Sequence, residues 1–232
     1  MRVLTWNVRQ LRDDAWAVAR ALRALDPDVV CLQEAPRLLR WRAKLAQLAR
    51  NSGLRPACGG RSAGDCALLV HPRVDVVDAR DLLLPKTRGL HRRGVALAVV
   101  RREAAALAVA SVHLGLDESE RRRHVEALIE ILGSVSAPVV VGADLNEVPD
   151  GPSWQLLGRR LSDCAVVAPD APASTYPARR PRVRIDALFA DPRVEVLECG
   201  VPPPPAGVPP YDVATDHLPV LARLRVGSDP AR

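Results

Sequence analysis

Short apolar runs make up much of this chain, and most of them end at a small polar residue. Runs of about four to eight apolar residues between turn-forming residues are typical of strands buried on both faces. An unpaired carboxylate is costly inside a core, so one that closes such a run belongs at a sheet edge. The runs end at or contain Asn7, Glu34, His113, Asp144, Asn146, Asp186, Asp216 and His217. If the strands share a sheet, these polar side chains meet at one end of it.

The size and composition of the chain favour one folded unit. With 232 residues and 48% hydrophobic content, it can bury a large core. We expect a single domain over residues 1–226 and a short tail over residues 227–232. Neither a signal-peptide pattern nor an apolar run long enough to span a bilayer is visible, so we expect a cytoplasmic protein with no membrane partner.

The charge and the cysteines say less about function. The net charge of +6 could favour a polyanionic partner, but the basic residues are spread along the whole chain, so it is weak evidence for nucleic acid. The five cysteines lack CxxC spacing. We therefore expect small buried thiols, with neither a disulfide framework nor a zinc site.

Periodicity and turn signals predict a mixture of helices and strands. We expect helices over residues 13–25, 37–50 and 117–133, and strands over residues 2–6, 28–32, 66–70, 74–83, 94–101, 106–113 and 138–141. Asp13 and Asp14 fall in the first turn of the first helix, and Asp117 with Glu120 resembles a capping box. Some strands are joined by helices and others by hairpin-length loops. This spacing predicts an α/β fold of mixed sheets covered by helices.

Two loops and four tryptophan or tyrosine residues complete the expected layout. A Gly/Ser/Arg-rich loop is predicted over residues 51–65, and a proline-rich loop over residues 201–210, between short strands. The proline-rich loop could be an SH3-type ligand, but its place inside the domain favours a stiff surface connection. Trp16 and Trp41 fall in helices and are expected in the core. Trp154 and Tyr176 are expected in loops near the polar residues.

The polar residues carry the chemistry of a phosphate-handling site. Asp144 and Asn146 are two residues apart, so an extended segment places both side chains on one face, where they could orient a water molecule. Turn formation explains the same pair without any catalysis. Glu34, at a strand end, could bind Mg²⁺, which prefers one or two carboxylates with waters and phosphate oxygens. Alone, it is equally well explained as the first turn of a helix.

Two histidines complete this inventory. His217 follows Asp216, and Asp186 is available to orient its ring, so an imidazolium there could stabilise a charged transition state. His113 is a second candidate acid or phosphate contact. Each of these residues has an ordinary structural explanation by itself. Coincidence does not explain six of them together at strand ends.

In order along the chain, the motifs TWN, LQE, SVHL, GADLN, RID and TDHLPV resemble the endonuclease/exonuclease/phosphatase superfamily. That superfamily includes DNase I-like nucleases, abasic-site endonucleases, sphingomyelinases and inositol polyphosphate 5-phosphatases. The match spans residues 5 to 219, nearly the whole chain. The resemblance implies a four-layer α/β sandwich, with two mixed sheets face to face, helices outside and the site at one end of the sheets.

The resemblance also implies roles for the polar residues. Glu34 would bind Mg²⁺ or Mn²⁺, with Asn7 and Asp216 as supporting or additional metal residues. Asp144 would activate the attacking water, and Asn146 would hold water or phosphate. His217, paired with Asp186, would stabilise the pentacovalent phosphorus, and His113 matches the histidine of the DNase I-like and sphingomyelinase-like branches. Contacts to substrate are expected from Arg93, Trp154, Tyr176 and Arg184.

Departures from the family pattern narrow the choice of substrate. Abasic-site endonucleases carry an acid where this chain has Arg9, a tyrosine where His113 stands, and a GWRLD-type segment where it has RVRID. Abasic-site repair is therefore disfavoured. Arg88, His91, Arg92 and Arg93 precede a strand and could contact a phosphate backbone, although a solvated basic hairpin explains them as well.

The sequence thus predicts a Mg²⁺- or Mn²⁺-dependent phosphoesterase that uses in-line attack by water. A nuclease acting on the phosphodiester bonds of nucleic acid is the first expectation. The first alternative is a phosphatase or phosphodiesterase of a small molecule or lipid headgroup. The second is a non-catalytic binding module on the same fold. Kinship at the level of fold does not fix the substrate.

Overall fold

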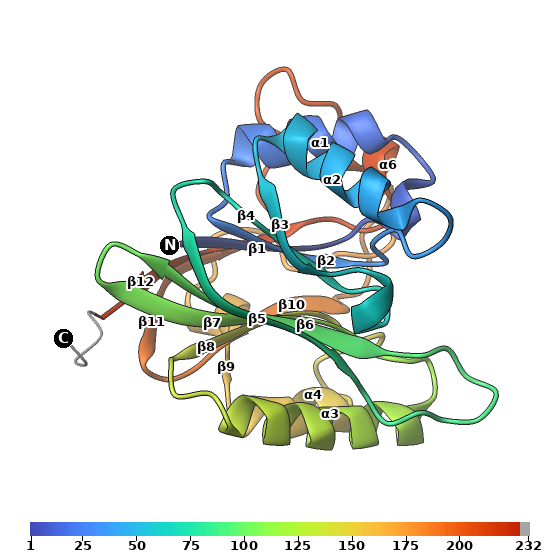
Figure 1. Ribbon diagram of the computed structural model, residues 1–232, viewed down its shortest axis with the longest axis vertical. Coiled ribbons are helices and arrows are strands. Elements are labelled where there is room, and N and C mark those ends of the chain that lie inside the picture. Colours follow the sequence, from blue (N-terminus) through green and yellow to red (C-terminus); the bar gives the residue numbers. More distant parts are fainter. Residues whose placement is uncertain (228–232) are drawn as a thin grey trace.

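The computed structural model describes residues 1–227, which form two six-stranded mixed sheets packed face to face. Helices cover the outer face of each sheet, which gives four layers in the order helix, sheet, sheet, helix (Figure 1). The predicted α/β sandwich is therefore confirmed.

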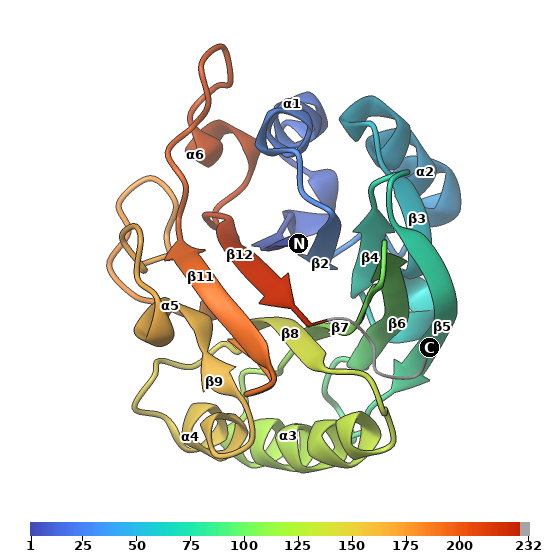
Figure 2. The ribbon, with the colours of Figure 1, turned by 90° about the vertical axis from the view of Figure 1, so that its left-hand side faces the viewer.

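The first sheet contains strands from both ends of the chain. Its strands lie in the order β11-β12-β1-β2-β4-β3. They span β1 Arg2–Asn7, β2 Val29–Gln33, β3 Arg55–Gly59, β4 Ala67–Val70, β11 Val194–Gly200 and β12 Val220–Val226. Its outer face is covered by α1 Ala15–Leu25 and α2 Trp41–Ser52, with the short α6 Tyr211–Ala214 beside them (Figures 1 and 2).

The second sheet comes from the middle of the chain, in the order β5-β6-β7-β8-β10-β9. Its strands span β5 Asp75–Leu83, β6 Gly94–Arg102, β7 Ala105–His113, β8 Val139–Asp144, β9 Ser162–Asp163 and β10 Asp186–Ala190. Its outer face is covered by α3 Glu118–Gly133 and α4 Pro152–Gly158, and the short α5 Cys164–Val167 follows β9. Two 3-10 turns, Arg9–Leu11 and Arg61–Ala63, lie in the loops.

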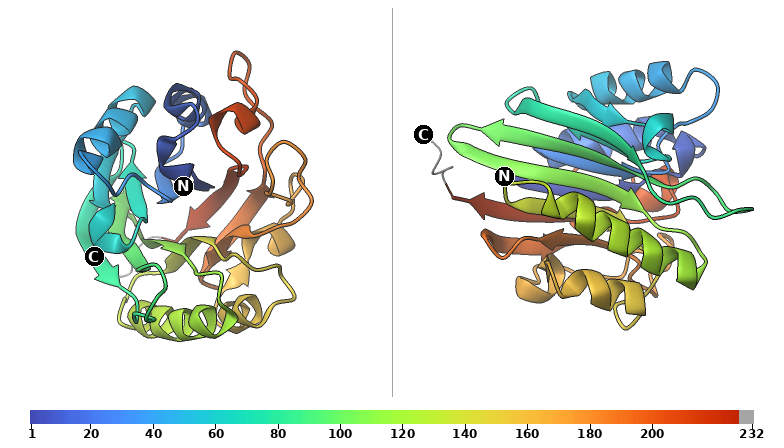
Figure 3. Two further views of the ribbon diagram at one scale, coloured as in Figure 1. Left: turned by 90° about the vertical axis from the view of Figure 1, so that its right-hand side faces the viewer. Right: turned by 60° about the horizontal axis from the view of Figure 1, so that its bottom comes forward.

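Each sheet contains one parallel pair of strands near its centre. β1 pairs with β2 and β7 pairs with β8 in parallel, while the remaining neighbours are antiparallel. A parallel pair needs a crossover, and α1 and α3 supply the two crossovers. The carboxyl ends of all four strands lie at the same end of the sandwich, which we call the active-site end (Figure 3, left).

Burial on both faces explains why the central strands β2, β7 and β8 are largely apolar. In β1, Val3 belongs to the core between the sheets, whereas Leu4 packs beneath α1 and α2. In β8, Val140 likewise faces the other sheet and Val141 packs beneath α3 and α4. Alternate residues of one apolar run thus fill two different hydrophobic layers.

The two sheets approach each other closely below the active-site end. A Cβ on Gly142 would lie 2.6 Å from Cys31 Cβ and 2.9 Å from Thr5 Cβ, so only glycine fits there. Gln33 crosses this seam and donates hydrogen bonds to the Gly142 carbonyl at 3.2 Å and to Ser111 Oγ at 3.1 Å. The seam therefore combines tight packing at Gly142 with buried hydrogen bonds between the sheets.

Side-chain caps fix where the helices begin. Asp14 accepts hydrogen bonds from the backbone N–H groups of Trp16 and Ala17, so it is the N-cap of α1, one residue before the helical turn in which it was expected. Asp117 accepts from the N–H of Glu120, which is one of the two hydrogen bonds of a capping box.

Three sequence expectations need correction, and a fourth falls largely outside the described residues. The predicted loop over residues 51–65 contains the edge strand β3. The indole of Trp16 is 63% exposed on α1, because the apolar face of that helix is formed by other residues. Trp154 belongs to α4 rather than to a loop. Of the expected tail, residues 228–232 lie outside the described residues.

Two further expectations concern membrane spans and thiols. No helix in residues 1–227 is long and apolar enough to cross a bilayer. All five cysteines are free thiols, and four of them are buried. Burial raises the pKa of the Cys58 thiol to about 12, so this thiol stays protonated and inert at neutral pH.

Candidate active site

Strand register brings three of the predicted residues side by side at the active-site end. Asp144 ends β8, and its direct neighbours across the ladder are His113 at the end of β7 and Asp186 at the start of β10. Asn7 ends β1 in the facing sheet, and Glu34 follows β2 directly. The seam between the sheets therefore gathers residues that lie far apart in the sequence.

Asp144 lies at the centre of this group and is 1% exposed. Its Oδ2 accepts a hydrogen bond from Asn7 Nδ2 at 2.9 Å and lies 3.5 Å from His113 Nε2 and 3.9 Å from His217 Nε2. Its Oδ1 accepts from the backbone N–H of Asn146 at 3.0 Å. A carboxylate so placed between two imidazoles can accept a proton on a side chain whose orientation is already fixed.

His217 is oriented by a buried carboxylate. Its Nδ1 lies 2.9 Å from Asp186 Oδ2, and its backbone carbonyl accepts a hydrogen bond from Trp6 Nε1. Asp186 is in turn held through its backbone N–H, which donates to Thr175 Oγ1. Burial alone would lower the pKa of His217, but the charges of Asp186 and Asp144 outweigh it and raise the pKa to about 9. The ring is therefore an imidazolium at neutral pH.

The second imidazole has a similar partner that the sequence did not reveal. His113 Nδ1 lies 3.2 Å from Asp65 Oδ1, and Arg93 Nη1 lies 3.1 Å from Asp65 Oδ2 and 2.7 Å from His113 Nδ1. Burial would lower the pKa of His113, but Asp65 and Asp144 raise it overall, against the opposing charge of Arg93.

Asp65 escaped prediction because it lies at the start of an apolar run rather than at its end. It directly precedes CALLV, and the search for polar residues followed the ends of strands. β4 runs antiparallel to β2, so the start of β4 lies at the same end of the sheet as the end of β2. An acid before an antiparallel strand is the signal that could have found it.

The His113–Asp65 and His217–Asp186 pairs determine the ionisation state of Asp144. Burial raises the pKa of a carboxyl group, but His113 and His217, followed by the hydrogen bond from Asn7, outweigh this and lower the pKa of Asp144. Asp144 is therefore ionised at neutral pH, between the His217 imidazolium and the His113–Asp65 pair.

Two residues of the site have left-handed backbone. Asn146 has φ 48° and Glu34 has φ 46°, a region that non-glycine residues occupy at some cost. The Asn146 side chain is fixed by donation from Nδ2 to the Leu114 carbonyl at 2.9 Å, and it also lies 3.2 Å from His113 Nε2. Backbone strain of this kind is common at functional sites, where it fixes the direction of a side chain at a cost in stability.

Glu34 has the properties of a metal ligand. Its side chain is half-buried, and Oε1 is approached by Asn7 Nδ2 at 3.4 Å, which leaves lone pairs free for a hard cation. The oxygen of Asn7 accepts from the backbone N–H of Arg9 at 3.0 Å, so the amide nitrogen faces Glu34 and Asp144. Asn7 therefore orients the carboxylates of Glu34 and Asp144 through its amide nitrogen.

Asp216 has a different partner from the one expected. Its Oδ2 lies 3.6 Å from Arg9 Nε. Asp216, and then Asp13, raise the pKa of the Arg9 guanidinium, with a smaller contribution from Glu34. A fixed positive charge therefore lies beside Asp216, where a second cation would otherwise be favoured.

A second group of possible ligands lies nearby. One ligand atom each from Asp144, Asp186 and His217 lie within 4.8 Å of one another. The hydrogen bond between His217 and Asp186 already uses two of the available atoms. Because Mg²⁺ prefers oxygen ligands and keeps several waters, Glu34 with phosphate oxygens suits that ion better.

The four expected substrate contacts lie in different surroundings. The Tyr176 ring lies 4.9 Å from the His217 ring and is 36% exposed, and Arg93 contacts His113. Trp154 is 3% exposed and packs on Phe189 within the hydrophobic layer, so it cannot contact substrate. Arg184 lies over Trp154 and is paired with Asp163. Of these four residues, only Tyr176 and Arg93 are next to His217 and His113.

Fold and site together define the class of α/β-sandwich phosphoesterases of the DNase I-like type. A buried carboxylate flanked by two imidazole–carboxylate pairs lies at the seam of two mixed sheets. The chain belongs to the endonuclease/exonuclease/phosphatase family, whose model matches residues 4–229.

Solved structures of similar fold come from several sources. A mannosyl-6-phosphatase from Bacteroides thetaiotaomicron superposes with a TM-score of 0.82 at 16% identity, covering 97% of this chain and 99% of that one. Danio rerio TDP2 in complex with a single-strand DNA product superposes with a TM-score of 0.76 at 18% identity, covering 97% and 99%. A conserved protein of unknown function from Enterococcus faecalis superposes with a TM-score of 0.80 at 18% identity, covering 98% and 100%. No curated protein matches the sequence significantly.

Proposed function

We propose that this chain is a divalent-metal-dependent phosphodiesterase in which water attacks phosphorus in line with the leaving oxygen. The observation that carries the proposal is the position of Asp144, whose Oδ2 lies within 4 Å of two imidazoles that are each held by a buried carboxylate. Asp144 accepts a proton from water as the new P–O bond forms. The imidazoliums face the charge that develops on the phosphate.

The two histidines have different roles in the proposed reaction. His217 donates a hydrogen bond from Nε2 to a phosphate oxygen. His113 donates its proton to the leaving oxygen as the old P–O bond breaks. The leaving group departs from phosphorus as an alkoxide, and the proton from His113 converts it to an alcohol. Glu34 would hold Mg²⁺ or Mn²⁺, which when bound supplies Lewis-acid stabilisation of the phosphate oxygens.

Nucleic acid is the first candidate carrier of the phosphodiester. The net charge of +6 supports it, and one structure of similar fold is that of a protein bound to single-strand DNA. Few exposed aromatic side chains are present for base stacking, which disfavours strong single-strand binding and favours duplex DNA as the first substrate to test.

A lipid headgroup is the second candidate. The specific observation in its favour is an apolar groove at the active-site end, lined by Leu38, Leu39 and Leu83 between arginines. A purely nucleic-acid-binding surface gains little from exposed leucines.

Two assays test the proposed activity. Wild-type protein and Asp144→Asn are incubated with supercoiled plasmid and with bis(p-nitrophenyl) phosphate, in Mg²⁺, Mn²⁺ or EDTA. Asp191→Asn is the matched control, because this carboxylate is paired with Arg193 away from the site. We expect metal-dependent cleavage of the diester that falls at least about 100-fold in Asp144→Asn. Full activity of Asp144→Asn, or activity unchanged by EDTA, would contradict the mechanism.

A further inference from the structure

Two loops at the active-site end expose leucines to solvent. Residues 35–41 follow β2, and residues 84–93 join β5 to β6 and project beyond the sandwich (Figure 3, right). The exposed fractions are 67% for Leu38, 84% for Leu39 and 41% for Leu90. Both loops contribute to one groove of about 760 Å³, together with the half-exposed Leu83. We call residues 35–41 and 84–93 the two-loop surface.

The two-loop surface is strongly basic. It contains six arginine or lysine residues and no aspartate or glutamate. Arg37, Arg40 and Arg92 line the groove, together with a fourth arginine, Arg61, from outside the two loops. Within residues 1–227, none of these four guanidinium groups is paired with a carboxylate. The buried Nε of Arg37 has no hydrogen-bond partner there either. The groove is therefore complementary to anionic groups.

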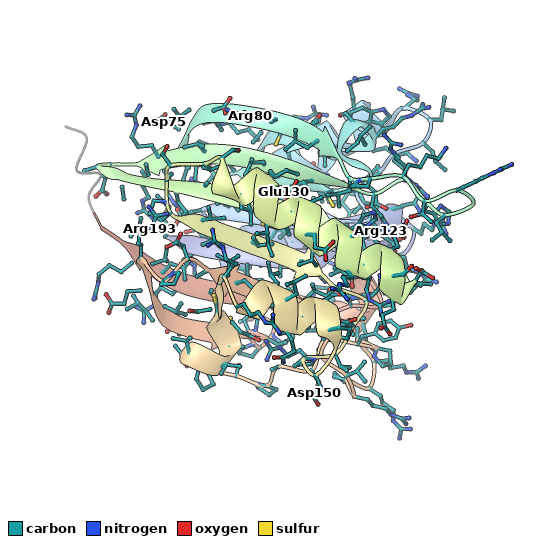
Figure 4. All side chains as sticks on the ribbon, turned by 90° about the horizontal axis from the view of Figure 1, so that it is seen from below. Asp75, Arg80, Arg123, Glu130, Asp150 and Arg193 are labelled. Atoms are coloured by element: carbon teal, nitrogen blue, oxygen red, sulfur yellow. The ribbon has the colours of Figure 1, made fainter. Side chains whose placement is uncertain are left out.

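The longer loop is held in its projecting position. His124 Nε2 lies 2.9 Å from the Pro85 carbonyl oxygen, and Arg123 on α3 donates to Thr87 Oγ1 at 3.1 Å (Figure 4 labels Arg123). A turn closes the tip, where the Leu90 N–H donates to the Thr87 carbonyl. Leu90 is thus presented to solvent by an anchored hairpin.

The two-loop surface adjoins the catalytic residues. The Ala35 N–H donates to the Asp65 carbonyl at 2.7 Å, and Arg93 ends the longer loop in contact with His113. A surface that bound to this end of the molecule would therefore meet the two-loop surface and the catalytic residues together.

We propose that the two-loop surface docks the protein on an anionic lipid surface, with its leucines in the interfacial region and its arginines on the headgroups. Apolar side chains flanked by basic ones bind membranes by combining burial with attraction to anionic lipid. Nucleic acid would use the arginines but would leave the leucines in water, because aliphatic side chains cannot stack on bases as aromatic ones do. The exposed leucines therefore favour an anionic lipid surface over nucleic acid as the binding partner.

This docking goes beyond the proposed hydrolysis and does not depend on it. It also differs from the sequence expectation that there is no membrane partner. That expectation considered only runs long enough to span a bilayer, whereas these leucines belong to two loops separated in the sequence. Docking would bring headgroup phosphates to the active-site end.

Vesicle sedimentation in EDTA tests the proposal without any turnover. Wild-type protein is mixed with phosphatidylcholine vesicles, with or without phosphatidylglycerol. We expect binding to the anionic vesicles that weakens with added salt. Leu38→Asp with Leu39→Asp should weaken it at least about tenfold, because burial of both side chains is lost and two negative charges are added. Leu90→Asp tests the second loop independently.

The control is Val166→Asp, which alters a side chain of similar exposure, 69%, on α5 at the other edge of the sheets. It should bind as wild type does, and thermal unfolding should show that every variant is folded. Binding that is equally strong in folded leucine variants would overturn the proposal. Absence of vesicle binding, with duplex DNA bound through the arginines alone, would overturn it in favour of nucleic acid. Neither result depends on whether the protein hydrolyses diesters.

Discussion

At the residue scale, buried carboxylates raise the pKa values of the two imidazoles in the candidate site. An exposed histidine is mostly neutral at pH 7. Here His217 is almost buried, which would favour the neutral ring further, yet Asp186 and Asp144 reverse the effect. The same competition between burial and nearby charge acts at His113, through Asp65. Removing either buried carboxylate should therefore change the pH dependence of the reaction.

The first prediction concerns the alkaline limb of the pH profile. Because the pKa of His217 is raised to about 9, its imidazolium is present below that pH and is lost as the pH rises through it. Diesterase activity should therefore fall above about pH 9. Asp186→Asn removes the largest raising charge, so the fall should move to lower pH. The measurement is kcat against pH for the two proteins, and an unshifted limb in folded Asp186→Asn would argue against the imidazolium role.

The second prediction tests Asp65, which the sequence did not single out. In Asp65→Asn, His113 loses the charge that raises its pKa but keeps Arg93 at 2.7 Å, so the neutral ring is favoured. We expect activity at neutral pH to fall by about 10- to 100-fold. Asp78→Asn, at an exposed ion pair with Arg80, is the control. The loss should shrink as the pH is lowered; a loss independent of pH would indicate a purely structural role.

At the element scale, a close approach of the two sheets at Gly142 supports the site. Gly142 in β8 faces Cys31 and Thr5 from the other sheet, and Gln33 bonds across the same gap. Asp144 follows Gly142 by two residues, while Asn7 follows Thr5 by two. The spacing between the sheets therefore sets the distance from Asn7 to Asp144.

The third prediction is that Gly142→Ala destabilises the fold and weakens catalysis together. The added Cβ would lie 2.6 Å from Cys31 Cβ, and the sheets must separate to admit it. We expect a loss of about 1–3 kcal/mol in the free energy of unfolding, measured with urea. Gly133→Ala at the end of α3 is the control, since nothing lies within 4 Å of its added Cβ. Equal stability of the two variants would show that the seam is looser than described.

Strand ends were predictable from the sequence, while contacts between elements were not. A buried strand needs a continuous apolar run, so Asp144 and His113 could be placed at strand ends from their neighbours alone. Trp154 was misplaced because a tryptophan on a short helix after a turn resembles a loop residue. Asp65 was missed because it precedes an apolar run instead of ending one, and because its partner His113 comes from the other sheet. The amide orientation of Asn7 depends on the Arg9 backbone, which residue types do not encode.

At the scale of the whole molecule, the site lies across the seam of the two sheets. Glu34 and Asn7 come from the first sheet, and His113, Asp144 and Asp186 come from the second. Each central parallel pair delivers its carboxyl ends to the same place. A ligand bound by residues of both sheets would therefore hold the two halves of the sandwich together.

The last prediction follows from that position. If Glu34 holds a divalent ion near Asp144, Mn²⁺ should bind the folded protein alone and raise its melting temperature, with EDTA reversing the change. At a metal concentration of 100 times Kd, such binding contributes about 2.7 kcal/mol to stability. Glu34→Gln should remove most of the shift, whereas Glu130→Gln, an exposed residue on α3 (Figure 4), should keep it. A shift that survives in Glu34→Gln but disappears in His217→Ala would instead assign the ion to the Asp144, Asp186 and His217 group, whose ligand atoms lie within 4.8 Å of one another.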